Sequence, residues 1–143
     1  MDEPTLAFTV PGRPVPLKRH RSTRTGRMYD PSCKDKAAWL AEARPYLPAA
    51  PLTGPLAVDA VFRMPRPKSH CRTGRYAHLL KDGAPAQHTS TPDIDNLAKL
   101  VLDAMNGHFF VDDAQIVRLS CRKVYDGVGG AGGTDVRITH ENT

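Results

Sequence analysis

Residues 92–125 read "PDIDNLAKLVLDAMNGHFFVDDAQIVRLSCRKVY" and contain the strongest periodic pattern of the chain. Four apolar residues recur at the i, i+3, i+4, i+7 spacing of one helix face, namely Leu97, Leu100, Val101 and Ala104. The pair Asn106-Gly107 is a typical helix stop. The pattern therefore predicts a helix from about Ile94 to Met105.

Two strand-like runs, "HFFV" and "QIVRLSCRKVY", lie on either side of the segment "DDA". In the second run apolar and polar residues alternate with the period of a strand: Val117, Leu119, Cys121 and Tyr125 against Arg118, Ser120 and Arg122. We expect a hairpin with one basic face.

The remaining elements follow from shorter patterns. Strands are predicted at 6–10 ("LAFTV"), at 55–65 ("PLAVDAVFRMP", with alternate residues apolar) and at 134–139 ("TDVRIT"). Ser32 is a plausible cap for a helix near 33–44, which Pro45 interrupts. The order of elements predicts an α+β fold, a small mixed β-sheet packed with two main helices. It does not determine the order of the strands.

Length and composition favour a single domain spanning 1–143, since a chain of 143 residues usually buries one core. There is no apolar run near the ~20 residues that span a bilayer, and the opening "MDEPTLAFTV" lacks the basic start of a secretion signal. The three cysteines are far apart and form no C-x-x-C motif, which suits reduced thiols. We therefore expect a soluble, cytoplasmic protein.

The chain carries 20 Lys plus Arg against 15 Asp plus Glu, a net charge of +5. Basic residues gather at 16–27 and 62–75, as in a footprint for a polyanion, although solvated surface loops would read the same way. Residues 65–92 show no periodicity and predict a flexible basic loop with a functional or mobile role. The candidate DNA-binding residues are Lys18, Arg19, Arg21, Arg24, Arg63, Arg66, Lys68, Arg72, Arg75, Arg118 and Arg122.

The acidic residues gather at both ends of the predicted helix. Asp93 and Asp95 stand where a carboxylate can accept from free helical N–H groups, which explains one of them without any function. Asp112 and Asp113 are adjacent, so their charges repel unless a cation or a solvent-facing turn relieves them.

A functional interpretation brings these carboxylates together. A strand that follows Asp112-Asp113 can lie beside the helix start, so we expect Asp93, Asp95 and one of that pair to converge. Such a group suits Mg²⁺ or Mn²⁺, which prefer oxygen ligands and keep several waters. Lys99 would then stabilise charge on a phosphate, whereas its structural alternative is an ordinary ion pair with Asp95 or Asp103.

Other candidates are weaker. His70, His78 and His88 share a loop with Cys71, but their spacings match no common zinc motif. The run "GVGGAGG" lacks the Lys-Ser/Thr ending of a nucleotide-binding loop. We interpret Trp39 as a core residue rather than a platform for a base.

The segment "PDIDNLAKLVLDAMNG…VDDAQIV" resembles the signature of the RusA-type Holliday junction resolvases, metal-dependent endonucleases mostly of prophages and phages that cut four-way DNA junctions. The close match covers 92–117, and "FTVPGRPVPLKRHR…GRMYDP" and the strand at 55–64 resemble the family's opening more loosely. The spacing D-x-D-N-L-x-K together with the later DD-x-Q is specific.

The resemblance implies a role for each residue of the motif. Asp93, Asp95 and Asp113 would be catalytic metal ligands, Lys99 the catalytic lysine and Asp112 a supporting carboxylate at the metal. It also implies a RusA-like homodimer. Some members carry an arginine-rich run directly before the first Asp, where this chain has "QHTST", so the basic residues of 62–75 would substitute in binding DNA.

The sequence thus predicts a Mg²⁺-dependent, structure-selective endonuclease that resolves four-way junctions by paired nicks in DNA recombination and repair. The alternative is a DNA-junction-binding protein of the same fold that does not cleave, with a structural acidic cluster. A calcium-stabilised interaction module is disfavoured because the D-x-D-x-D-G loop is absent.

Overall fold

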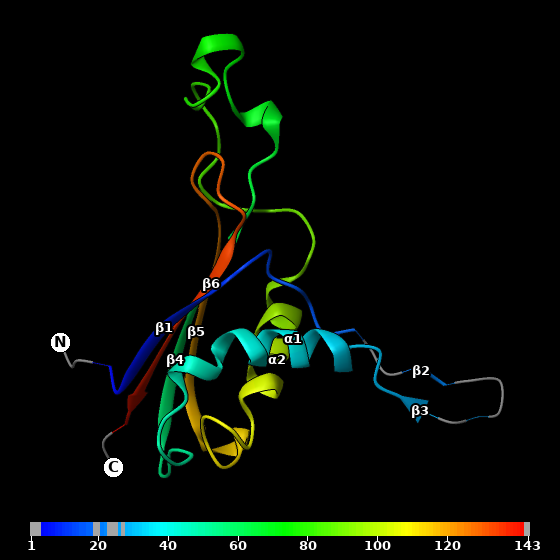
Figure 1. Ribbon diagram of the computed structural model, residues 1–143, viewed down its shortest axis with the longest axis vertical. Coiled ribbons are helices and arrows are strands. Elements are labelled where there is room, and N and C mark those ends of the chain that lie inside the picture. The colour runs from blue at the N-terminus through cyan, green and yellow to red at the C-terminus, as the bar shows by residue number, and fades with distance from the viewer. Residues whose placement is uncertain (1–3, 19–20, 23–25, 27, 142–143) are drawn as a thin grey trace.

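A computed structural model describes residues 4–18, 21–22, 26 and 28–141, and its centre is a four-stranded sheet with the order β1-β6-β4-β5. Both long helices lie on the same side of this sheet (Figure 1). The elements of this layer are β1 (Leu6–Pro11), α1 (Cys33–Ala43), β4 (Leu56–Met64), α2 (Ile94–Met105), β5 (Ile116–Tyr125) and β6 (Gly133–His140). The predicted α+β class and mixed sheet are confirmed.

The mixed pairing follows from the connections. From β4 the chain crosses over through α2 before it enters β5, so β5 pairs parallel to β4, as a helical crossover requires. The last strand, β6, lies antiparallel between β1 and β4. A separate two-stranded ribbon, β2 (Arg21–Ser22) and β3 (Met28–Tyr29), extends away from this layer (Figure 1).

The predicted hairpin around "DDA" is wrong, because "HFFV" forms a tight turn instead of a strand. Gly107 has a φ of +79°, a value that favours glycine, and its N–H donates to Phe110 O over 2.9 Å. Phe109 and Phe110 are both fully buried. Two adjacent side chains cannot both face the core from a strand, where neighbours point to opposite sides.

The core lies between the sheet and the two helices. Helix α2 begins and ends as predicted, and its apolar stripe belongs to the same core cluster as Leu56, Val58, Ala60 and Phe62 of β4. Phe8 of β1 stacks on Phe109 with ring centroids 5.0 Å apart. Trp39 of α1 lies 9% exposed beside Phe8, which confirms its place in the core.

Helix α1 also follows its prediction, with one difference at the cap. Ser32 is the N-cap residue, but its Oγ accepts a hydrogen bond from Lys18 N over 2.7 Å and does not cap the helix. The helix ends at Ala43, and the chain continues as a 3₁₀ turn, Arg44–Tyr46, because proline at position 45 disfavours a continued α-helix.

Residues 65–92 form an arm that projects beyond the end of the sheet, next to the glycine-rich loop 126–132 (Figure 1). The arm contains two short 3₁₀ turns, Lys68–His70 and Gly74–Tyr76, and an antiparallel bridge between Cys71 and Leu80. It has no long element, as its sequence predicts. No helix in the described part of the chain is long and apolar enough to cross a membrane.

Candidate active site

The first acidic pair lies at the N-terminus of α2. Asp93 is the N-cap residue with extended backbone angles, but its side chain makes no capping bond, and Asp95 lies in the first turn. Both residues are exposed, and neither carboxylate has a hydrogen bond or ion pair with another described residue. The capping explanation for Asp93 therefore does not hold, and both carboxylates are free to bind a cation.

The second acidic pair lies at the opposite end of α2. Asp113 N donates to Oδ1 of Asn106, the C-cap residue of that helix, over 3.0 Å. Asp112 caps the short 3₁₀ turn Asp113–Gln115 by accepting from Ala114 N over 3.1 Å, and the side chain of Gln115 accepts from Asp112 N in return. The Asp112 carboxylate thus has a structural task that Asp113 does not share.

The Asp113 carboxyl lies close to two other acidic groups. Loss of hydration, then the hydrogen bond and charge of Asp112, and then the charge of Asp103 raise the pKa of the Asp113 carboxyl. A proton or a cation at this position relieves the repulsion between the acidic groups.

The expected convergence of Asp93, Asp95 and one of Asp112 or Asp113 is wrong within one chain. Helix α2 spans twelve residues, so its ends are about 18 Å apart at 1.5 Å per residue. Strand β5 does lie beside the helix, but it starts at the helix C-terminus and reaches the Asp93 end only near Lys123. Among the residues the structure describes, no group of three His, Cys, Asp or Glu side chains is placed to hold a metal ion.

Lys99 lies one turn after Asp95 on the exposed side of α2. Neither of its structural alternatives is formed in the described part of the chain, because no ion pair links it to Asp95 or Asp103. Asp103 lies 3.8 Å from the ammonium of Lys36 instead. Lys99 therefore remains available to a negatively charged ligand at the helix start.

The N-terminal basic segment meets the helix near its acidic N-terminus. Leu17 N donates to Asn96 O over 2.9 Å, which holds the exposed Lys18 close to Asp95. Arg19 and Arg24 lie outside the described residues, and Arg21 is described only as part of β2.

The arm reaches the site from the other direction, and its end is fixed by a residue that the sequence analysis missed. Lys123 Nζ donates to Ser90 O over 2.6 Å and to Pro92 O over 2.8 Å, immediately before Asp93. The available signal was a lysine among the apolar residues of one side of β5. Lys123 thus ties that strand to the start of α2.

Several predicted DNA-binding arginines already have partners in the protein. Arg63 donates to Asp135 through Nε (3.0 Å) and to Asp126 through Nη1 (2.9 Å). Arg66 donates to Asp126 O and Pro85 O and lies over the Tyr125 ring. The remaining arm and strand cations are all exposed: Lys68, Arg72, Arg75, Arg118 and Arg122. Of these, Arg72 pairs with Asp82, Arg118 pairs with Glu141, and Arg75 donates to the Tyr76 hydroxyl. Arg63 thus has the least freedom to contact DNA.

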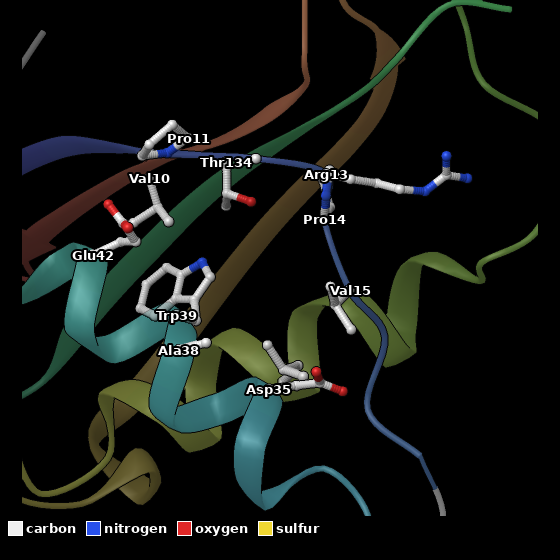
Figure 2. Close-up of a pocket in the computed structure, with 12 residues that line it drawn as sticks. Val10, Pro11, Arg13, Pro14, Val15, Asp35, Ala38, Trp39, Glu42 and Thr134 are labelled. Carbon is white, nitrogen blue, oxygen red and sulfur yellow. The ribbon is translucent and has the colours of Figure 1, made fainter.

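A cavity of about 200 Å³ lies between the N-terminal segment and α1 (Figure 2). It is lined by the segment 10–15, by Trp39 and by the carboxylates Asp35 and Glu42 of α1. None of the motif residues that lie at either end of α2 lines it. The cavity is therefore separate from the candidate site.

A small α+β domain in which free carboxylates adjoin basic segments is typical of an enzyme that acts on nucleic acid. The sequence pattern of the family described as Endodeoxyribonuclease RusA matches residues 11–139. The chain therefore belongs to the RusA family, whose members are endodeoxyribonucleases that resolve Holliday junctions with a divalent metal. It is also 34% identical over 127 residues to the uncharacterized protein YqaN of Bacillus subtilis (strain 168), covering 84% of this chain and 87% of that protein.

Proposed function

We propose that this protein is a Mg²⁺-dependent endonuclease that resolves four-way DNA junctions by paired nicks during recombination or repair. The observation that carries this proposal is the start of α2. There the free carboxylates of Asp93 and Asp95 lie between the basic N-terminal segment and the end of the arm. Four-way junctions bring phosphates from several strands close together, which suits carboxylates that lie near the exposed cations Lys18 and Lys99.

The donor set fits a hard divalent cation. Carboxylate oxygens are the preferred ligands of Mg²⁺, and Mn²⁺ accepts the same set. Asp93, Asp95 and Asp113 would hold the ion, with Asp112 supporting Asp113 from the adjacent turn. When bound, the ion supplies Lewis-acid activation of the phosphodiester and lowers the pKa of water.

The protein's own groups would act around that ion. Lys99 would place its ammonium beside the phosphate and stabilise the negative charge that develops as the bond breaks. Lys18 and the arm cations would hold the flanking phosphates. Lys123 would act as a positioning residue, because it fixes the backbone that precedes Asp93.

We further propose that each site is shared between two copies in a homodimer. In one chain Asp93 and Asp113 lie at opposite ends of α2, a helix of twelve residues that is about 18 Å long. A two-fold axis near the middle of α2 and β5 would place the start of α2 in one copy beside the end of α2 in the other copy. Asp113 of one copy would then approach Asp93 and Asp95 of its partner, and the dimer would have two equivalent sites.

The outer edge of β5 supports this arrangement. Within the described residues, only the arm reaches that edge, at Val124, and the part before it pairs with no strand. Val111, Val117 and Leu119 near this edge are 59%, 63% and 46% exposed. An unpaired strand edge beside exposed apolar side chains is typical of an interface between copies.

Nicking of a labelled four-way junction tests the activity, with Mg²⁺, with Mn²⁺ and with a chelator. We expect cuts that leave 5′-phosphate and 3′-hydroxyl ends, only when a divalent ion is present. A cut of equal rate in the chelator would contradict the metal site. Binding without any cut would favour the alternative of a non-cleaving junction binder.

Mixing two inactive variants tests the shared site. In a mixed dimer of Asp95→Asn and Asp113→Asn chains, one site carries both substitutions and the other carries neither. About half of the dimers in an equal mixture are mixed if the chains exchange freely. Nicking should therefore return in the mixture, and a mixture of freely exchanging chains that stays inactive would show that each chain builds its own site.

A further inference from the structure

A second binding feature lies on the arm, away from the acidic pairs at the two ends of α2. A groove of about 580 Å³ separates the start of the arm from the glycine-rich loop 126–132. This volume is within the roughly 300–1,000 Å³ range of sites for small ligands. The groove is lined by Arg66, Lys68, Arg72 and Ala77 on the arm and by Val128, Gly129 and Gly130 on the loop, among others.

The walls of the groove are fixed by hydrogen bonds before any ligand arrives. On the arm side, Arg66 Nε donates to Asp126 O over 3.0 Å, and its guanidinium lies 5.2 Å from the centroid of the Tyr125 ring. On the loop side, the Asp126 carboxylate accepts from Gly127 N and Gly132 N, both over 2.9 Å. Asp126 thus holds both walls, and the groove is preformed.

The lining has the chemistry of a site for a nucleotide rather than for a duplex. Its lining is mostly apolar, with Ala77 and Val128 on opposite walls, while Lys68 and Arg72 provide positive charge at the same site. Arg72 Nη2 also lies 3.4 Å from Asp82 Oδ1, in an ion pair whose two side chains are both exposed. A Cβ on Gly130 would lie 2.2 Å from Asp126 Oδ2, so only glycine lets the Asp126 carboxylate lie this close to the loop that forms the second wall.

We propose that this groove takes one unpaired nucleotide of branched DNA, with the base between the two walls and its phosphates on Lys68 and Arg72. Arginine guanidinium planes stack on bases, and the apolar walls exclude water from the ring. The groove thereby recognises the unstacked nucleotides of a branch point. This inference rests on the proposed function, since it names the part of the DNA substrate that the arm binds.

Binding to short duplexes without metal tests the groove. One duplex carries a single unpaired nucleotide, and the other has the same sequence fully paired. We expect about tenfold tighter binding to the first, because stacking on one base contributes roughly 1–3 kcal/mol and 1.4 kcal/mol corresponds to tenfold. Ala77→Phe fills the groove and should remove this preference, whereas Ala86→Phe, on an exposed part of the same arm, should keep it.

Each outcome decides the proposal. A protein that binds both duplexes equally, or a folded Ala77→Phe variant that keeps the preference, would overturn it. If Ala77→Phe does not fold by circular dichroism, Val128→Phe fills the groove from the opposite wall, where the side chain is 38% exposed. Nicking of a four-way junction by the unchanged protein tests the endonuclease activity separately. If the protein nicks the junction but binds both duplexes equally, only the proposal for the groove is refuted.

Discussion

Arg63 links three strands at the end of the sheet next to the arm. Its guanidinium donates to Asp135 of β6 and to Asp126, which follows β5. Burial alone would raise the pKa of Asp126 and of Asp135. The hydrogen bonds of Arg63, joined by Gly127 N at Asp126 and by Thr9 at Asp135, outweigh burial and lower both. Arg63 therefore has a structural role, and the DNA contact expected from its sequence position stays a prediction.

These lowered pKa values predict a loss of stability in acid. A carboxyl with a depressed folded-state pKa contributes its full stabilisation above its unfolded value, here 3.8, and loses it as the pH falls further. We expect the free energy of unfolding to decline below that pH, and Arg63→Ala to weaken the decline. At neutral pH this variant should lose about 2 kcal/mol, the scale of hydrogen bonds between charged groups.

Urea unfolding at several pH values measures both effects. Arg137→Ala is the matched control, because Arg137 is exposed on β6 two residues after Asp135 and has no ion pair among the described residues. If the free energy of unfolding depends on pH equally in Arg63→Ala and in the unchanged protein, the structural role of Arg63 is refuted.

Asp113→Asn should abolish nicking and leave folding and junction binding intact. The substitution keeps the size of the side chain and an oxygen ligand, but removes the charge that would hold the cation. Lys99→Ala should likewise lower the turnover number more than the affinity, as expected of a group that acts on transition-state charge. Nicking and gel-shift assays at matched protein concentrations separate these effects.

Asp112→Asn is the control for the acidic pair. Asparagine also caps turns, so the hydrogen bond to Ala114 N should persist and nicking should fall less than in Asp113→Asn. Full nicking by a folded Asp113→Asn protein would refute the metal-ligand role. An equal loss in both variants would show that the two carboxylates share that role.

Among individual residues, those with regular spacing could be predicted best. The buried positions of α2 follow from four apolar residues at the spacing of one helix face. The contacts of Lys123 and Asp126 instead involve backbone groups, which no pattern of side chains reveals. The motif identified the acidic residues of the candidate site. Their separation by a full helix depends on the direction in which β5 passes α2, which only the fold determines.

At the scale of elements, the arm depends on its attachment to β5. We expect Lys123→Met to keep the length of the side chain but release the backbone of Ser90 and Pro92. The start of α2 would then be held less closely, so the turnover number should fall several-fold with little change in junction affinity. Single-turnover nicking measures this loss, and reduced affinity with normal turnover would contradict the positioning role.

Other elements show where sequence patterns stop being informative. Strand β5 was predicted correctly as a strand, but its partner was not, because alternation of side chains does not distinguish a hairpin from a parallel crossover. "HFFV" has strand-like composition, yet the left-handed Gly107 turns the chain so that both phenylalanines enter the core. Tertiary packing thus overrode a local preference.

At the scale of the whole molecule, many of the basic residues belong to the arm and to the N-terminal segment. Most of the arm is exposed, as is Lys18 of the N-terminal segment, and both segments adjoin α2. We therefore expect the logarithm of the junction binding constant to fall linearly with the logarithm of salt concentration, with a slope of about −0.9 per neutralised phosphate. Replacing Lys68 and Arg72 together should make the slope less negative by about twice that amount, because two phosphate contacts are lost.

Fluorescence anisotropy across a range of salt concentrations gives the slope directly. Arg122→Ala, an exposed cation on the open face of β5, serves as a comparison that tells whether this face also contacts phosphates. Affinity that stays constant as the salt concentration rises would remove the basis for assigning either basic segment to DNA.

The length of α2 has a consequence for the protein concentration at which the enzyme can cut chromosomal DNA. If the acidic groups at the two ends of one helix must come from different copies, a solitary chain is harmless. Below the dimer dissociation constant, the rate of cutting would then rise with the square of the protein concentration. A sparse protein would leave intact chromosomes untouched and become active only where chains accumulate on branched DNA, and the order of reaction in dilute nicking assays would reveal this threshold.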